Sequence, residues 1–241
     1  MAQRQTSFAI GEFYHIYNRG NHKQEIFLDK QDYDRFQRLL YLCNGSVPIN
    51  IRDIRTSSVD FYKYERGDQL VSIGAYCLMP NHFHVLATPL VENGLSVFMK
   101  KLGTSYSMYF NKRYGFTGSL FEGRYKASYV GEDTYLKYLY SYIHLNPMKL
   151  LGKEWREKGV SSTKEAIDYL SKFPHSSFYD YVGTSRREGV ILSPEGFPQY
   201  FQTSKEHFTE VLDWLSPRTD LGEETDLGEE GEDFVEMFLR L

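Results

Sequence analysis

The chain has 241 residues but no long apolar run and only two cysteines. A membrane-spanning helix needs about 20 apolar residues, so the sequence predicts no membrane span. The first residues also lack the apolar core of a secretion signal, which favours a cytoplasmic protein. In a reducing cytosol, Cys43 and Cys77 are expected to be buried free thiols in apolar surroundings, and a disulfide between them is the alternative.

The chain also lacks an excess of positive charge, and its formal net charge is −4. This value alone is unusual for a protein that binds DNA, but the charge is unevenly distributed. Residues 219–241 contain nine acids and one base, so the rest of the chain has an excess of four positive charges. Between Lys100 and Lys158, eleven bases face five acids. An exposed basic face there would attract a phosphate backbone, and a solvated mixed surface is the alternative.

Aromatic residues are abundant, with 20 Tyr and 17 Phe. They serve as core residues, as platforms on which bases stack, or as both. The length suits one domain, or one domain with an appendage, and a substantial core.

Hydrophobic periodicity predicts three strands, over residues 12–18, 70–78 and 82–88, and a strand or hairpin arm over 120–130. Helices are predicted from Asp29 or Lys30 to Cys43, from a cap at Asn93 to Gly115, and from a cap at Asp133 to just before Pro147. Residues 44–69 are polar and indicate a long loop or a peripheral hairpin. The order β-α-β-β-α-β-α predicts an α+β, ferredoxin-like sandwich, an antiparallel sheet with helices on one face.

The pattern weakens after residue 152, and we expect three parts. Residues 1–152 form the main domain, and residues 153–218 form a helical or irregular C-terminal extension with helices near 162–172 and 205–215. Residues 219–241 form an acidic tail with a short helix near 233–241. In this tail, Asp220-Leu221-Gly222-Glu223-Glu224 recurs as Asp226-Leu227-Gly228-Glu229-Glu230. A mobile linker is expected, and a tail that mimics DNA and covers the basic site is the alternative.

Two short motifs carry chemistry. His82 and His84 stand two residues apart and point to the same face of a strand. Tyr142 and Asn146 stand four residues apart and share one face of a helix. Two neutral imidazoles and one amide oxygen suit Mg²⁺ or Mn²⁺ with waters and a substrate phosphate. Placed against each other, the motifs supply the metal ligands His82, His84 and Asn146, and Tyr142 as a covalent nucleophile for cutting a phosphodiester.

Each residue also has a simpler interpretation. The histidines could be ordinary surface residues, and Asn146 before Pro147 could merely end the helix. Tyr142 lies among Tyr135, Tyr138 and Tyr140, which on helical spacing alone is typical of core residues.

His144 lies about 200° around the helix from Tyr142, so it should face away from the metal and serve packing. If the segment were not helical, His82, His84 and His144 could form a three-histidine zinc site.

Several sequence blocks resemble the HUH endonucleases, within them the single-tyrosine transposases, and most closely the REP-associated tyrosine transposases. The blocks are residues 14–20, 77–86, 118–126, 142–147 and 176–178. The resemblance implies the same ferredoxin-like fold and a metal-dependent strand transferase acting on single-stranded DNA near a small hairpin. It also implies a 5′-phosphotyrosine at Tyr142, a free 3′-hydroxyl, and no need for ATP. Members of the superfamily are monomers or homodimers, and the REP-associated type favours a monomer.

A domesticated nucleic-acid-binding protein that no longer cleaves is the alternative function, and a zinc hydrolase is a third. Residues 44–69 and the acidic C-terminus depart from the pattern of the resemblance, which leaves the recognition of the hairpin open. The sequence does not identify a general base for Tyr142. Residues in the basic segment and matched blocks are candidates for DNA contact: Arg19, Lys100, Lys101, Lys112, Arg113, Arg124 and Lys126. Arg19, Arg124 and Lys126 lie in matched blocks, whereas the helix lysines could belong to a solvated helix face.

Overall fold

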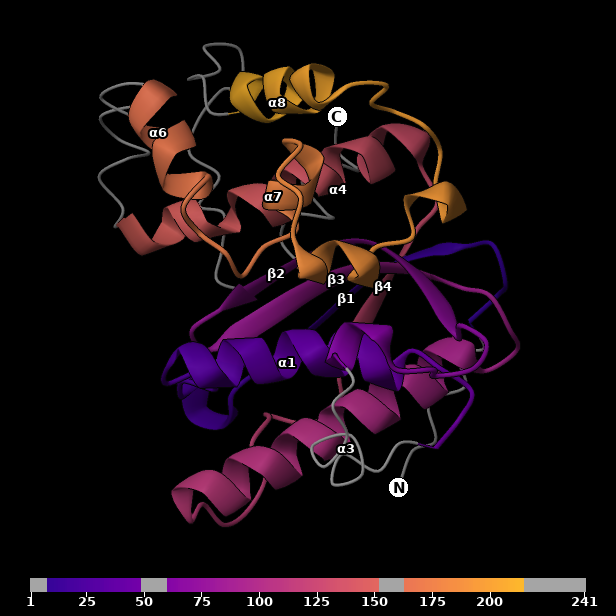
Figure 1. The fold of residues 1–241 in the computed structure, drawn as a ribbon, viewed down its shortest axis with the longest axis vertical. Coiled ribbons are helices and arrows are strands. Elements are labelled where there is room, and N and C mark those ends of the chain that lie inside the picture. The colour runs from indigo at the N-terminus through magenta and orange to yellow at the C-terminus, as the bar shows by residue number, and fades with distance from the viewer. Residues whose placement is uncertain (1–7, 49–59, 152–162, 215–241) are drawn as a thin grey trace.

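The computed structural model describes residues 8–48, 60–151 and 163–214, which contain a four-stranded antiparallel sheet (Figure 1). The strands are β1 (Phe13–Arg19), β2 (Val71–Met79), β3 (His82–Pro89) and β4 (Lys126–Val130). Their order across the sheet is β2-β3-β1-β4. Together with the alternation of strands and helices along the chain, this order confirms the predicted α+β, ferredoxin-like fold.

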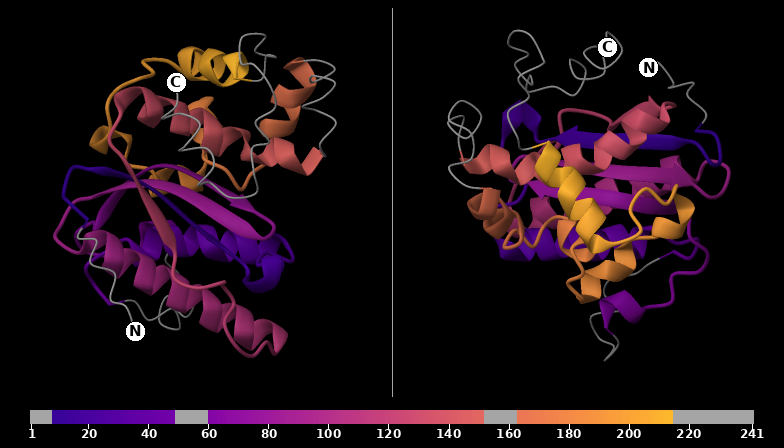
Figure 2. Two further views of the ribbon diagram at one scale, coloured as in Figure 1. Left: turned by 180° about the vertical axis from the view of Figure 1, so that it is seen from behind. Right: turned by 90° about the horizontal axis from the view of Figure 1, so that it is seen from above.

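Helices lie on both faces of this sheet (Figures 1 and 2). The α-helices of the described residues are α1 (Lys30–Cys43), α3 (Gly94–Tyr114), α4 (Asp133–Leu145), α6 (Thr163–Leu170), α7 (Phe178–Tyr181) and α8 (Ser204–Asp213). The short 3₁₀ helices are η1 (Asn21–Lys23), η2 (Phe61–Lys63), η3 (Asn146–Leu151), η4 (Arg187–Ile191) and η5 (Pro194–Gly196). The face with α1 and α3 matches the prediction, but α4 and the C-terminal helices cover the opposite face. The reason is that β2 is buried along its whole length, so both of its faces need a cover.

The helix ends follow local chemistry only in part. The Asp29 carboxylate accepts hydrogen bonds from the backbone N–H groups of Gln31 and Asp32, which starts α1 as predicted. Gly115 ends α3 in the left-handed conformation, also as predicted, with φ of 62°. Of the other two caps, the position of Asn93 was predicted correctly, and that of Asp133 was predicted one residue too late. Asn93 precedes α3 without a side-chain hydrogen bond, and the residue before α4 is Glu132 rather than Asp133.

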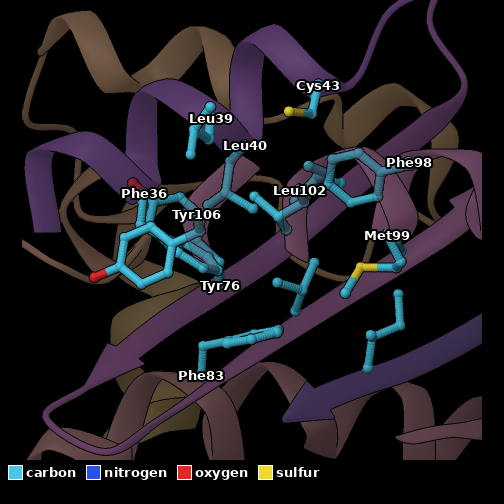
Figure 3. Packing of buried hydrophobic residues seen from close by; sticks show 14 of the residues in the cluster. Phe36, Leu39, Leu40, Cys43, Tyr76, Phe83, Phe98, Met99, Leu102 and Tyr106 are labelled. Carbon is cyan, nitrogen blue, oxygen red and sulfur yellow. The ribbon is translucent and has the colours of Figure 1, made fainter. Parts of the chain in front are cut away.

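The face of the sheet toward α1 and α3 holds the larger core (Figure 3). Phe36 of α1 packs against Phe83 of β3 and against Tyr106 of α3, with ring centroids 5.0 Å and 4.9 Å away. Both contacts join segments that are far apart in sequence. Burial of such aromatic side chains stabilises the domain, and many aromatics of the described residues are buried or pack against the buried clusters.

The opposite face of the sheet packs against α4, and a β-bulge makes this approach possible. The register of β2 against β3 shifts between Ile73 and Ala75. A Cβ atom on Gly74 would lie 2.8 Å from the Tyr140 hydroxyl of α4 and 2.9 Å from the ring of Phe197. Glycine is therefore required here so that α4 can lie directly on the sheet.

The remaining predictions have mixed outcomes. The predicted helices of the C-terminal extension exist as the shorter α6 and α8, and the predicted strand over residues 120–130 is only β4. Cys43 and Cys77 are buried free thiols, as predicted. The acidic repeat, the terminal helix and much of the 44–69 segment lie outside the described residues. The three-part domain division stays a prediction. Within the described residues, no helix has the length and apolarity needed to cross a bilayer.

Candidate active site

The register of the sheet brings polar side chains of β1 and β3 to the face that α4 covers. Tyr17 of β1 pairs with His84 of β3, and Arg19 pairs with His82. Paired residues of antiparallel strands point to the same face, and so does every second residue. His15 therefore joins this row, on the same face as Tyr17 and Arg19.

His84 is almost fully buried and has one ring nitrogen engaged. Its Nδ1 lies 2.9 Å from Nε2 of His15, and the two imidazoles stack with centroids 5.0 Å apart. Its Nε2 is buried and has no hydrogen-bond partner among the described residues. A buried nitrogen without a hydrogen-bond partner destabilises the folded state, and such atoms are often explained by a function or a bound ion. This atom is therefore a candidate metal ligand.

His82 has a similar arrangement. Its Nδ1 lies 2.6 Å from Oδ1 of Asn81, whose Nδ2 donates to the carbonyl of Lys23. That second bond identifies Oδ1 as the amide oxygen, so Nδ1 of His82 must be the donor. The lone pair of a neutral His82 is then on Nε2, the nitrogen left for a metal.

Both histidines are neutral, as metal ligands must be. Burial lowers the pKa of His82 to about 3 and holds the pKa of His84 well below its usual range. The positive charge of Lys149 acts in the same direction on both. These imidazoles are therefore free of a competing proton at neutral pH.

Helix α4 carries Tyr142 to the histidine row. The Tyr142 ring makes edge-on contacts with the rings of His84 and His15, at centroid distances of 5.5 Å and 5.8 Å. The two motifs, far apart in sequence, thus meet within one chain. Tyr138 and Tyr140 are more deeply buried in the packing between α4 and the rest of the protein, whereas Tyr142 is half-buried.

Asn146 stands one helical turn after Tyr142, at the junction of α4 and η3. Its Nδ2 donates to the backbone carbonyl of Tyr142 at 2.8 Å. This bond fixes the orientation of the amide and so identifies which atom is the oxygen Oδ1. This Oδ1 is buried and, within the described part of the chain, has no partner. An uncompensated amide oxygen beside Tyr142 is suited to a hard divalent cation. The α-helix α4 ends at Leu145, just before Pro147, and the chain continues from Asn146 as the 3₁₀ helix η3.

The phenol of Tyr142 is difficult to ionise. Burial raises its pKa to about 12 and the nearby Tyr135 acts in the same direction, whereas a hydrogen bond with the Asn146 side chain lowers it. The ammonium of Lys149 lies 5.3 Å from the centroid of the Tyr142 ring. A cation near a phenol interacts more favourably with the phenolate than with the neutral form.

His144 faces away from this site, as predicted. Its Nδ1 lies 2.9 Å from Nε2 of His207, and its Nε2 lies 2.7 Å from the hydroxyl of Ser177. It thus joins α4 to α8 and to the start of α7. Because α4 is helical through Tyr142 and His144, the three-histidine zinc alternative has no geometric support. The described residues contain no group of three or more His, Cys, Asp or Glu that could hold a metal. The candidate ligands His82, His84 and Asn146 are not such a group, because the third ligand is an amide.

The basic candidates for DNA contact separate into three groups. Arg19 lies beside His82, and the ammonium of Lys126 lies 5.8 Å from the ring of Tyr17 on the same face of the sheet. Lys100 and Arg124 line a groove of about 770 Å³ between α3 and the segment before β4. This groove also contains Asn18, which belongs to the face of β1 opposite the histidines.

The other three candidates lie on α3. Lys112 is exposed near its end. Lys101 donates to the backbone carbonyls of Gly45 and Val47. Arg113 forms ion pairs with Asp29 and Asp32 at 2.5 Å and 2.7 Å. Lys101 and Arg113 therefore have partners within the fold, and their contact with DNA stays a prediction.

Four residues near the site were not identified from the sequence: His15, Tyr17, Asn81 and Lys149. The signal for His15 and Tyr17 was present, because strand alternation places both on the face of Arg19. Asn81 directly precedes His82. Lys149 had no comparable signal, since its position depends on the 3₁₀ turn of η3 after Pro147.

Comparison with known proteins identifies a family. The family described as "Transposase IS200 like" matches residues 13–146, more than half of the chain. None of the curated proteins matches. Among solved structures, the chain is similar to a REP-associated tyrosine transposase bound to a REP hairpin. It shares 15% sequence identity at a TM-score of 0.42, over 78% of this chain and 90% of the other. At these values the likeness has no bearing on the site.

Proposed function

Because the chain belongs to the IS200-like transposase family, a family of DNA-cleaving enzymes, we propose that it cuts and rejoins single-stranded DNA near hairpins through a 5′-phosphotyrosine. One observation carries the proposal. Tyr142 lies against His84, and two buried atoms of the same two motifs, His84 Nε2 and Asn146 Oδ1, are left without partners within the described chain. A nucleophile beside unused metal-ligand atoms is what this chemistry requires.

The ligand set favours Mg²⁺ or Mn²⁺. His82, His84 and Asn146 would hold the ion through two imidazole nitrogens and one amide oxygen, all neutral. When bound, such an ion supplies a Lewis acid that polarises the scissile phosphate and orients it. The neutral state of both buried histidines fits this role, because no proton competes for their lone pairs.

Tyr142 performs the bond exchange in the proposed reaction. Its phenolic oxygen attacks phosphorus, the bond to the 3′-oxygen breaks, and the phenolic proton is lost as the 3′-oxygen gains one. Lys149 stabilises the developing phenolate from its position near the ring. In the reverse step a 3′-hydroxyl attacks the phosphotyrosine and restores the phenol, so the phosphodiester bond energy is conserved.

The DNA would approach along basic side chains that lie on both faces of the sheet. Arg19 and Lys126 lie on the face of the histidines, and Lys100, Lys112 and Arg124 lie on or beside α3. Cationic groups at these places suit a phosphate backbone. Since His84 and Tyr142 meet within a single chain, a monomer can provide the complete site.

A cleavage assay tests the proposal. The protein is incubated with single-stranded oligonucleotides that do or do not contain a hairpin, in Mn²⁺, Zn²⁺ or EDTA. We expect a covalent adduct on denaturing gels and a free 3′-hydroxyl fragment, only with Mn²⁺ or Mg²⁺ and only beside a hairpin. Hairpin binding without an adduct in any metal would indicate the non-cleaving alternative, and cleavage without an adduct in Zn²⁺ would indicate a hydrolase.

A further inference from the structure

His15 lies near the site, and the proposed chemistry provides no role for it. It is buried within β1 and lies in a different strand from the two candidate ligands. Its Nε2 lies 2.9 Å from Nδ1 of His84, and its ring stacks on that of His84 at an interplanar angle of 21°. It also touches the edge of the Tyr142 ring. His15 therefore contacts a candidate ligand and the candidate nucleophile.

Only one proton can lie between the two imidazoles, and its position decides what His84 can do. If Nε2–H of His15 donates, the proton of a neutral His84 must be on its own Nε2. That nitrogen then has no lone pair for a metal. If Nδ1–H of His84 donates instead, its Nε2 keeps the lone pair.

The neighbouring histidine shows which arrangement the strand uses. His82 must donate from Nδ1, because its partner is the amide oxygen of Asn81. His82 and His84 lie two residues apart on β3 and on the same face of the sheet. In each of them, Nδ1 is within hydrogen-bond distance of a neighbouring side chain. In His84 the buried Nε2 faces no donor or acceptor among the described residues, which suits a lone pair that awaits a cation.

We propose that His15 is a positioning residue that accepts the Nδ1–H of His84 and so directs the lone pair of His84 Nε2 at the metal. This inference rests on the proposed metal site and assigns a residue to its support. His15 acts through His84, and its own proton is then on Nδ1. The geometry makes it the counterpart of Asn81, so each histidine ligand has one such partner.

Two substitutions of His15 test the proposal. Together they distinguish the effect of the hydrogen bond from the effect of packing. His15→Gln places an amide oxygen where Nε2 was and can still accept the bond. His15→Phe fills the space without an acceptor. His175→Gln is the matched control, because this imidazole stacks on Tyr33 on the other side of the sheet. Melting curves confirm that each variant is folded.

The first measurement is the tautomer of His84 in the metal-free wild type, from long-range ¹H–¹⁵N correlation spectra. We expect the Nδ1–H form, and finding the Nε2–H form would overturn the proposal. The second is Mn²⁺ affinity by titration calorimetry. Loss of a hydrogen bond to a metal-ligating histidine weakens binding about 10-fold to 100-fold, which we expect for His15→Phe. We expect His15→Gln and His175→Gln to stay within about threefold of the wild type, a small effect on this scale.

The outcomes separate this inference from the proposed function. Mn²⁺ affinity in His15→Phe equal to that of the wild type would contradict the role of His15. An Nδ1–H tautomer with weakened binding in His15→Phe supports that role even if no DNA adduct ever forms. In that case the proposed function fails and the support of the metal site stands. If His15→Phe does not fold, the wild-type tautomer and the His15→Gln titration decide the matter.

Discussion

The ring of Tyr142 stands edge-on to the imidazole of His84, at a centroid distance of 5.5 Å and an interplanar angle of 80°. The two residues are 58 positions apart, on α4 and β3. The contact brings a phenolic oxygen to the row of histidines without a second chain. It is the structural basis of the first three predictions below.

Tyr142→Phe should keep DNA binding and abolish the covalent adduct, because only the hydroxyl is removed. The phenylalanine ring preserves the packing on His84, so the free energy of unfolding should change by no more than about 1 kcal/mol. Denaturing gels and a binding titration measure the two properties. Tyr138→Phe is the control, since this residue packs on Trp214, and it should form adduct normally. An undiminished adduct in Tyr142→Phe would place the nucleophile elsewhere, with Tyr138 or Tyr140 next.

His82→Ala and His84→Ala should each abolish Mn²⁺-dependent cleavage. Loss of metal activation removes several kcal/mol of transition-state stabilisation, so the rate should fall about a thousandfold. His82 is half-buried at the end of β3, so its replacement should leave the fold intact, which circular dichroism checks. Full activity in either variant at limiting Mn²⁺ would contradict the ligand assignment.

Lys149→Met should slow adduct formation about tenfold, a barrier change of about 1.4 kcal/mol. The pKa of Tyr142 is raised to about 12 by burial, so the phenolate is scarce and a nearby cation stabilises it. Since the working pH lies below this pKa, the rate should rise about tenfold per pH unit from about pH 6.5 to pH 8.5. Lys149→Arg keeps the charge and should restore most of the rate. Single-turnover rates at several pH values test both expectations, and a rate in Lys149→Met equal to that of the wild type would exclude the role.

Acid should weaken the docking of α8 on α4 through His207. Burial lowers the pKa of His207 to about 3, whereas an unfolded histidine binds a proton near 6.5. The unfolded state therefore binds more protons between these values. The stabilisation is complete above about pH 6.5 and is lost as the pH falls toward about 3, at about 1.4 kcal/mol per pH unit for one group.

Urea titrations from pH 7 to pH 4 measure this effect. His207→Gln should be less stable at pH 7, because the bond to His144 changes, and its stability should depend less steeply on pH. His22→Gln alters an exposed side chain and should keep the slope of the wild type. A slope in His207→Gln as steep as that of the wild type would show that His207 does not contribute.

Deletion of residues 219–241 removes an excess of eight negative charges. If this tail screens the basic face, the deletion should tighten binding to a hairpin oligonucleotide, most at low salt, where the Debye length is about 30 Å at 0.01 M. Binding by the truncated protein should also fall more steeply with salt, because more phosphate contacts release more counterions. We expect equal affinities of the full and truncated proteins at low salt, the result for a solvated tail. Tighter binding by the truncated protein would establish screening.

The sequence by itself determined the elements and predicted the candidate site residues on them. Periodicity located β1, α1, β2, β3, α3 and α4 to within a few residues, because apolar spacing and local capping act over short distances. The histidine pair and the Tyr142–Asn146 pair each followed from the geometry of a single element. Caps were less reliable: Asn93 stands at the start of α3 in the left-handed conformation, with φ of 58°, and not in the extended conformation from which a cap side chain bonds the helix.

The tertiary structure decided which residues meet. His15 and His84 are 69 positions apart, and their contact depends on the β1–β3 register. The bulge at Gly74 lets α4 lie on the second face of the sheet, so the helices cover two faces instead of one. Arg113, a candidate for DNA contact because of its positive charge, forms ion pairs with Asp29 and Asp32 in the folded chain. Registers, burial and ion pairs between distant segments arise only when the chain is folded, and no local pattern encodes them.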